Sequence, residues 1–163
     1  MVAGVVGDME NTVEEFSKMN HDRTKKIIVY ISGTWDLFHI GHLNAIITAK
    51  KLGDELIVGV STDELIRKYK KYDPIYPYKD RLKIIESLKY VDRIVTQEEL
   101  STEEQFRALN FDVLVVGDDW KGKYLSGIEW IRKHESKVVI YLPRTPGIST
   151  SSIRKRLYAN VIK

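Results

Sequence analysis

The residues with the clearest chemical potential are gathered in one stretch of ten, GTWDLFHIGH at positions 33–42. Two histidines, His39 and His42, stand three positions apart with Gly41 between them. The apolar, β-branched run at 27–31 predicts a buried strand before the stretch, and a helical period follows it. Backbone N–H groups at a helix start are unpaired and favour negative charge, and a glycine lets an anion approach closely. The stretch therefore predicts a phosphate-type anion site at a strand-to-helix turn.

Strand-like and helix-like segments alternate along the chain, which is typical of a parallel sheet with crossover helices. We expect strands at 27–32, 55–60, 92–96, 112–116 and 137–142. Helices are expected at 41–52, after a cap at Ser61–Glu64, at 78–90, at 101–109 with a capping box from Ser101 to Glu104, at 124–134 and at 150–159, with a loop over 68–77. The predicted fold is α/β, a doubly wound (Rossmann-like) parallel five-stranded sheet with helices on both faces.

Three polar clusters each follow a predicted strand, at 33–42, 117–123 and 144–152. Open parallel sheets bind ligands at the carboxyl ends of their strands, and these ends lie at one edge. We therefore expect the three clusters to form a single active site.

Composition limits the possible functions. The 163 residues suffice for one domain with a sizeable core, and 43% apolar with 30% charged residues is ordinary for a globular chain. The net charge of +3 does not indicate nucleic acid, and we expect no nucleic-acid partner. No apolar run approaches ~20 residues and no signal peptide is evident, so no membrane association is expected. The chain has no cysteine, which excludes thiolate chemistry and fits a reducing cytoplasm.

The first residues are expected to be an appendage. Residues 1–25 predict an N-terminal extension, helical or flexible, ahead of a domain at 26–163. Within the extension, the spacing of Val13, Phe16 and Met19 predicts about two helical turns over 11–19.

Three motifs together resemble a known enzyme family. GTWDLFHIGH, which ends in HxGH, resembles the nucleotidylyltransferase signature, and RTPGISTS at 144–151 is similar to the RTEGISTS element of cytidylyltransferases. GDDWKGK at 117–123 and YVDRI at 90–94 resemble the bacterial glycerol-3-phosphate cytidylyltransferases. The likeness covers about residues 26–156, so the domain at 26–163 is identified as a member of that catalytic family.

The resemblance implies a nucleotidyltransferase that moves CMP from CTP to a small phosphorylated alcohol. The leading acceptor is sn-glycerol 3-phosphate, with CDP-glycerol and pyrophosphate as products. Mg²⁺ bound with the triphosphate, a homodimer and a cytoplasmic location are also implied, whereas the metal ligands stay open. Three alternatives remain: another acceptor such as phosphoethanolamine or phosphocholine, adenylyl transfer to FMN as in FAD synthetases, and a non-catalytic nucleotide-binding module.

By resemblance, catalysis is assigned to four residues, namely His39, His42, Lys68 and Arg144. The histidines would hold the triphosphate and stabilise the pentacoordinate α-phosphorus, which is where cationic donors matter most. Nucleotide binding is assigned to Gly33, Thr34, Trp35, Asp36, Gly41, Asp118, Thr145, Gly147, Ile148, Ser149 and Thr150. Acceptor binding is assigned to Lys70, Lys89 and Trp120.

Several of these residues also have a structural interpretation. Asp36 either contacts a ligand or braces the turn, and Trp120 either stacks on a substrate or packs. Paired histidines also occur in zinc sites, but the chain has no cysteine and no third ligand at motif spacing. Lys89 stands where the family commonly has arginine, and a lysine keeps the charge but lacks the planar fork that makes a bidentate contact. Pro146 stands where the family has glutamate.

Overall fold

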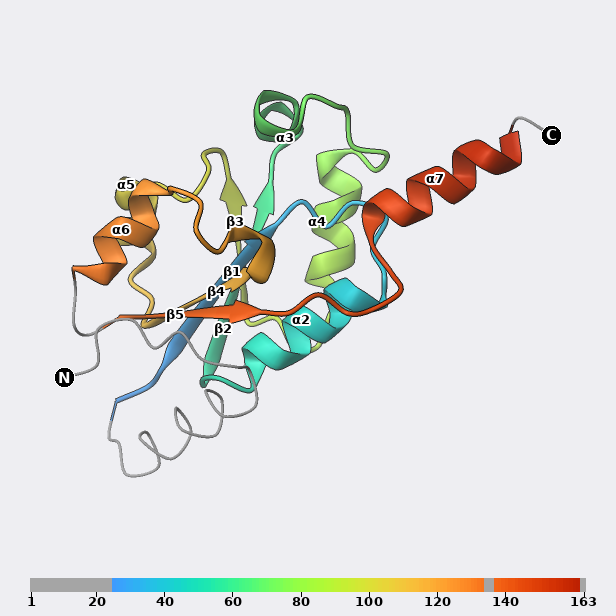
Figure 1. Cartoon of the computed structure of the whole chain (residues 1–163). Coiled ribbons are helices and arrows are strands. Elements are labelled where there is room, and N and C mark those ends of the chain that lie inside the picture. Colours follow the sequence, from blue (N-terminus) through green and yellow to red (C-terminus); the bar gives the residue numbers. More distant parts are fainter. Residues whose placement is uncertain (1–24, 134–136, 162–163) are drawn as a thin grey trace.

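A five-stranded parallel sheet forms the centre of the protein (Figure 1). The computed structural model describes residues 25–133 and 137–161, so the helix expected over 11–19 lies outside the described residues. The sheet order is β3-β2-β1-β4-β5 and each pair of neighbours is parallel. The strands are β1 (Ile28–Gly33), β2 (Glu55–Ser61), β3 (Arg93–Gln97), β4 (Val113–Gly117) and β5 (Val138–Leu142). This order confirms the predicted doubly wound sheet.

Helices cover both faces of the sheet, as predicted. They are α2 (Ile40–Lys50), α3 (Asp63–Lys70), α4 (Tyr78–Glu86), α5 (Glu103–Leu109), α6 (Ser126–Arg132), α7 (Thr150–Val161) and a short 3₁₀ helix, η1 (Asp118–Trp120). Helices α2 and α4 lie on one face, and α5 and α6 lie on the other (Figure 1). In the part of the chain that the structure describes, no helix is long and apolar enough to cross a membrane.

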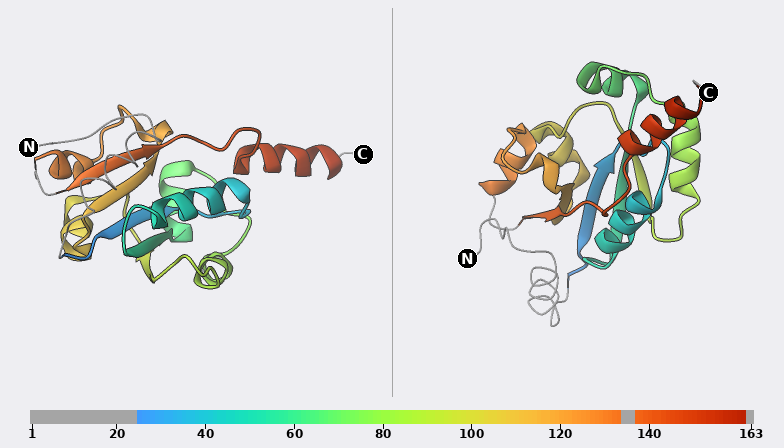
Figure 2. Two further views of the ribbon diagram at one scale, coloured as in Figure 1. Left: turned by 90° about the horizontal axis from the view of Figure 1, so that it is seen from below. Right: turned by 45° about the vertical axis from the view of Figure 1, so that its right-hand side comes forward.

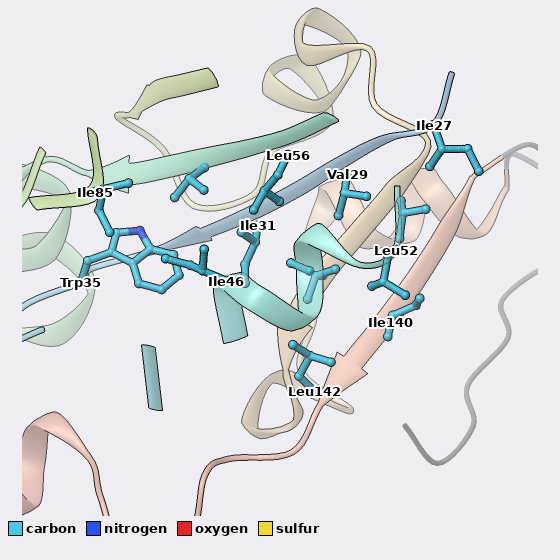
Figure 3. Packing of buried hydrophobic residues seen from close by; sticks show 14 of the residues in the cluster. Ile27, Val29, Ile31, Trp35, Ile46, Leu52, Leu56, Ile85, Ile140 and Leu142 are labelled. Carbon is cyan, nitrogen blue, oxygen red and sulfur yellow. The ribbon is translucent and has the colours of Figure 1, made fainter. Parts of the chain in front are cut away.

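The core is divided by the sheet into two apolar clusters. Successive side chains of a strand point to opposite faces, so Val29 and Ile31 of β1 join one cluster and Tyr30 joins the other. Figure 3 shows the first cluster, in which Ile46 of α2 and Ile85 of α4 pack against the strands. Both helices are thereby fixed on the same face of the sheet, and the 33–42 stretch connects the end of β1 to α2.

Two helix starts lie one residue later than expected. Thr62, not Ser61, caps α3, because its hydroxyl accepts the Leu65 N–H (3.1 Å), whereas the Ser61 hydroxyl in β2 donates to Gln97 (2.8 Å). Likewise Thr102, not Ser101, caps α5, with its side chain accepting from a backbone N–H one turn on. Where two adjacent residues could both cap a helix, sheet pairing and tertiary contacts determine which of them does so.

Other element ends differ as well. The loop expected from residue 68 begins only at 71, because α3 continues to Lys70 and ends at Lys71 in the left-handed conformation (φ 61°). Helix α4 ends at Glu86 rather than 90, and α6 spans fewer residues than expected. Helix α7 extends away from the sheet and its covering helices in the left view of Figure 2, and none of its residues is buried.

Gly127 of α6 allows this helix to approach α5 closely. A Cβ atom at Gly127 would lie 2.5 Å from the Phe106 ring and 2.5 Å from the Ser101 carbonyl oxygen. We predict that Gly127→Ala lowers the free energy of unfolding by about 1–3 kcal/mol, because the overpacked backbone must shift. Urea unfolding measures this. Ser126→Ala, at the exposed neighbouring position, serves as the control and is expected within about 0.5 kcal/mol of the parent. Equal urea midpoints for the two variants would contradict the packing argument.

Candidate active site

The two histidines of the 33–42 stretch are stacked on each other at the start of α2. Their ring centroids are 3.8 Å apart with an interplanar angle of 18°. His39 caps α2, and its Nδ1 accepts the Gly41 N–H (3.1 Å), so the neutral ring carries its proton on Nε2. A Cβ at Gly41 would lie 3.0 Å from the His39 ring, so this glycine makes room for the imidazole. Nε2–H of His39 is left as a donor for a ligand.

The expectation of open backbone donors at this helix start is wrong for three of the amides. The Gly41 N–H is taken by His39 Nδ1, and the His42 and Leu43 N–H groups donate to the His39 carbonyl oxygen (2.9 and 3.1 Å). The side chain and carbonyl of the capping residue satisfy these amides locally. The imidazoles, rather than these backbone N–H groups, are therefore the donors that this turn offers to an anion.

His42 is held neutral by its surroundings. Its ring packs edge-on against Trp35 at 5.4 Å and lies tilted against Phe38 at 5.5 Å. Its buried Nδ1 has no hydrogen-bond partner among the described residues. Burial, with smaller contributions from His39 and Lys70, lowers the pKa of His42 to about 3. Burial also lowers the pKa of His39. At neutral pH the pair consists of two uncharged imidazoles.

Asp36 lies beneath this turn and is fully buried. Its Oδ1 accepts N–H bonds from Leu37 (3.1 Å) and Tyr76 (2.9 Å), and its Oδ2 accepts from Ile75 N–H (2.9 Å) and Arg154 Nη2 (3.1 Å). Burial acts to raise the pKa of Asp36, but the two loop N–H groups and Arg154 outweigh it and the net pKa is lowered. Asp36 thus remains ionised and braces the turn, which was one of its two sequence interpretations.

The residues just before Asp36 are also buried. Trp35 is 4% exposed and its Nε1–H donates to the Gly59 carbonyl (2.8 Å), so it anchors the turn to β2 rather than facing a ligand. A Cβ at Gly33 would lie 3.0 Å from the Trp35 ring, which explains the glycine there. The Thr34 hydroxyl is hydrogen-bonded to the Tyr69 hydroxyl of α3 (2.9 Å). Of these nucleotide-binding assignments, the structure gives Gly33 and Trp35 positions that support the turn.

Arg81 is a buried residue of this region that the sequence analysis did not identify. Its guanidinium is fully buried and donates to the Thr34 carbonyl (2.6 Å), the Tyr76 carbonyl (3.0 Å) and the Asp63 carboxylate (2.6 Å). A signal was available, because Arg81 stands four residues before the inward-facing Ile85 and so shares its helix face. Arg81 therefore connects the turn at 33–42, here called the motif turn, to the start of α3 and to the loop before α4.

The lysines of α3 are separated by the helix. Lys70 lies within electrostatic reach of Asp36, Asp119 and Arg144, and desolvation lowers its pKa despite the two carboxylates. Its Nζ lies over the rings of Tyr69 (5.5 Å) and Tyr72 (5.9 Å). Both lysines are exposed, and Lys68, two residues earlier, points about 200° away around the helix. The geometry therefore brings Lys70 to the site, whereas Lys68, the lysine assigned to catalysis by resemblance, points elsewhere.

The 144–150 segment lies against the motif turn, as expected if the clusters meet at the carboxyl edge of the sheet. Thr150 donates its hydroxyl to the Asp36 carbonyl (3.2 Å), and Thr145 accepts from Asn44 Nδ2 of α2 (3.3 Å). Ile148 lies beside Gly41, with 3.5 Å from its methyl to a Cβ built there. Ser149 is paired with Ser152 at the start of α7, and Gly147 has the positive φ of 78°.

The segment after β4 is tied to this loop by an ion pair. Arg144 Nη2 lies 2.8 Å from Asp119 Oδ2, and both side chains are accessible. Asp118 is exposed in η1. Trp120 packs partly on the α5–α6 cluster, with Lys123 Nζ 5.0 Å from its ring centroid, which favours the packing interpretation of this residue. Arg144 is thus an accessible cation on this side of the site.

Lys89 is not brought to the site. It follows α4 and precedes β3, and Asp92, three residues later, donates its N–H to the Leu56 carbonyl near the beginning of β2. A residue before a parallel strand lies at the amino edge of the sheet, opposite to the carboxyl edge where the other clusters meet. Within this chain Lys89 therefore lies away from the other clusters, and its assignment to the acceptor stays a prediction.

The depressed pKa of His42 has a consequence for stability. Between about pH 6.5 and pH 3 the unfolded chain binds a proton at His42 that the native protein does not, so stability falls as the pH falls. We predict a loss of up to about 1.4 kcal/mol per pH unit below 6.5 from this residue. Urea unfolding at pH 7.5, 6.5, 5.5 and 4.5 measures it. The stability advantage of the parent over His42→Asn is expected to shrink with falling pH, and a constant difference would refute it.

The chain is similar in sequence to known proteins over most of its length. A sequence model of the family described as cytidylyltransferase-like matches residues 30–156. The glycerol-3-phosphate cytidylyltransferase of Bacillus subtilis is 40% identical over 135 residues, which cover 82% of this chain and 97% of that protein. The enzyme of the same name from Staphylococcus aureus is 37% identical over 85% of this chain and 99% of its own.

Two further similarities extend beyond these enzymes. An FAD synthase of Thermococcus onnurineus is 35% identical over 85% of this chain and 96% of its own. The crystal structure of a lipopolysaccharide core biosynthesis protein from Thermoplasma volcanium superimposes with a TM-score of 0.61 and 30% identity, over 72% of this chain and 98% of that chain. The stacked histidines, the Arg144 loop and these matches agree: the chain belongs to the cytidylyltransferase-like family.

Proposed function

We propose that the protein transfers CMP from CTP to sn-glycerol 3-phosphate, giving CDP-glycerol and pyrophosphate. The observation that carries the proposal is the match, over nearly their whole length, to relatives named glycerol-3-phosphate cytidylyltransferase. The site supports it, because two stacked imidazoles, Lys70 and Arg144 meet at the carboxyl edge of the sheet. Such a site suits a polyanionic substrate more than a neutral one.

The reaction needs stabilisation of charge more than proton transfer. An oxygen of the acceptor phosphate attacks the α-phosphorus, a new P–O bond forms, and the bond to the bridging oxygen of the β-phosphate breaks. In this proposal His39 donates through Nε2–H and His42 donates beside it to oxygens around the α-phosphorus. Lys70 and Arg144 supply formal positive charge from the two sides. Donors fixed before the reaction stabilise the transition state without reorganisation.

Mg²⁺ is proposed to arrive with CTP. The described residues contain no group of three or more His, Cys, Asp or Glu side chains able to hold a metal ion. Asp36, the acidic residue of the motif, already accepts four hydrogen bonds and is fully buried. Phosphate oxygens and water would therefore supply most of its ligands, since Mg²⁺ usually keeps several waters and binds substrate phosphates.

We further propose a homodimer that acts in the cytoplasm, as the family resemblance implies. The exposed apolar side chains of α7, Leu157, Tyr158 and Val161, support a partner surface on this projecting helix. Sedimentation velocity of the purified full chain would report the oligomeric state directly.

The proposed substrates are tested by pyrophosphate release with CTP, ATP, GTP and UTP. Each nucleotide is paired with glycerol 3-phosphate, phosphoethanolamine, phosphocholine and FMN. We expect turnover with CTP and glycerol 3-phosphate. Release with ATP and FMN but not with CTP would place the chain with the FAD synthases, and no release with any pair would indicate a non-catalytic nucleotide-binding module.

The role of the histidines is tested by substitution. We predict that His39→Ala or His42→Ala lowers kcat by about 10²–10³-fold, because each removes one donor near the α-phosphorus. Lys79→Ala, an exposed change on α4, is the matched control and should leave kcat unchanged. Circular dichroism confirms folding of each variant. Near-normal turnover of either histidine variant would rule out its direct role.

A further inference from the structure

The loop at 71–77 joins α3, which ends in Lys70, to α4, which carries Arg81. It contains no regular secondary structure, and it is attached to the motif turn through backbone groups. The N–H groups of Ile75 and Tyr76 donate to the carboxylate of Asp36 (2.9 Å each). The position of Lys70 therefore depends on what holds this loop and Asp36 together.

Arg154 is the side chain that closes this arrangement from α7. Its Nη2 donates to Asp36 Oδ2 (3.1 Å) and to the Asp73 carbonyl (2.8 Å), so one nitrogen contacts both the turn and the loop. Its guanidinium carbon lies 4.2 Å from the ring centroid of Tyr72. The side chain is 16% exposed although α7 projects from the domain. This burial shows that the first turns of α7 are part of the site's support.

Tyr72 transmits this contact toward Lys70. Arg154 lies against the Tyr72 ring, and Lys70 Nζ lies 5.9 Å from the centroid of the same ring. Arginine stacks over aromatic rings through its planar guanidinium, a contact that lysine does not reproduce. The ring is thus located by Arg154 and in turn limits where Lys70 can lie.

We propose that Arg154 is a positioning residue, which locks the 71–77 loop onto Asp36 and so sets the place of Lys70 for the acceptor-directed step. The inference rests on the proposed function for its kinetic part only. Arg154 need not touch either substrate, since it acts through Asp36, Asp73 and Tyr72. The sequence motifs did not indicate it, because it lies beyond the RTPGISTS element.

The first experiment follows the loop without any substrate. Hydrogen exchange of the Ile75 and Tyr76 amides is compared in the parent, Arg154→Gln and the control Arg156→Gln, which alters an exposed arginine of the same helix. We expect exchange at the two amides to rise about tenfold or more in Arg154→Gln, with β1 amides unchanged, because the loop opens locally. Unchanged exchange in Arg154→Gln would overturn the proposal.

The second experiment measures kinetics with the same variants. We expect kcat/KM for the acceptor to fall about 10–100-fold in Arg154→Gln, since small misplacement of a catalytic group is costly, while CTP binding changes less than about threefold. Arg154→Lys keeps the charge near Asp36 and should recover part of the loss. If Arg154→Gln raised amide exchange in the loop but left kcat/KM for the acceptor at the parental value, Arg154 would only stabilise the loop, and the positioning role would be refuted.

A double-substitution cycle separates this role from general destabilisation. Tyr72→Leu removes the ring and is expected to reproduce part of the acceptor effect. The combined Arg154→Gln/Tyr72→Leu effect should be smaller than the product of the single effects, because both act through one contact. Multiplicative effects would refute transmission through Tyr72. If the parent makes no product from CTP and glycerol 3-phosphate, the proposed function fails, whereas the exchange result still decides the loop contact.

Discussion

The structure of the site depends on one buried carboxylate, that of Asp36. An ionised group taken out of water costs several kcal/mol unless its oxygens are satisfied, and here four donors satisfy them. The donors come from the turn itself, from the 71–77 loop and from α7. The segments must therefore meet around Asp36 for the charge to be stable, and the stacked histidines are carried on the same turn.

A second buried ion pair works from the other side of the loop. Arg81 donates to the Asp63 carboxylate (2.6 Å) and to the Thr34 and Tyr76 carbonyls. Tyr76 is held at both backbone groups, since its N–H donates to Asp36 and its carbonyl accepts from Arg81. The loop is thus fixed between two buried charges, which gives Lys70 and the start of α4 defined positions without regular secondary structure.

The sequence was sufficient for the sheet and for the position of the strand-to-helix turn at 33–42, because both follow from local periodicity and from the rule that parallel strands share a carboxyl edge. It was not sufficient for the ion pairs. Asp36 and Arg154 are 118 residues apart, and the Arg81–Thr34 contact spans 47 residues. The motifs also did not show that Lys89 lies at the amino edge of the sheet, since a motif does not tell which edge of the sheet a residue occupies.

The stacking of His39 and His42 explains why the positive charge of the site is carried by Lys70 and Arg144 rather than by the two imidazoles. Two protonated rings 3.8 Å apart would repel each other by about 4 kcal/mol at an effective dielectric constant near 20. Burial and this proximity keep His42 neutral, so the pair acts as hydrogen-bond donors and the formal charge falls to Lys70 and Arg144. Those two cations lie on longer side chains, and their placement depends on the 71–77 loop and on Asp119. In the proposed reaction, the neutral donors fixed at the helix start and the cations held around them by the 71–77 loop and Asp119 would stabilise the charge that develops at phosphorus.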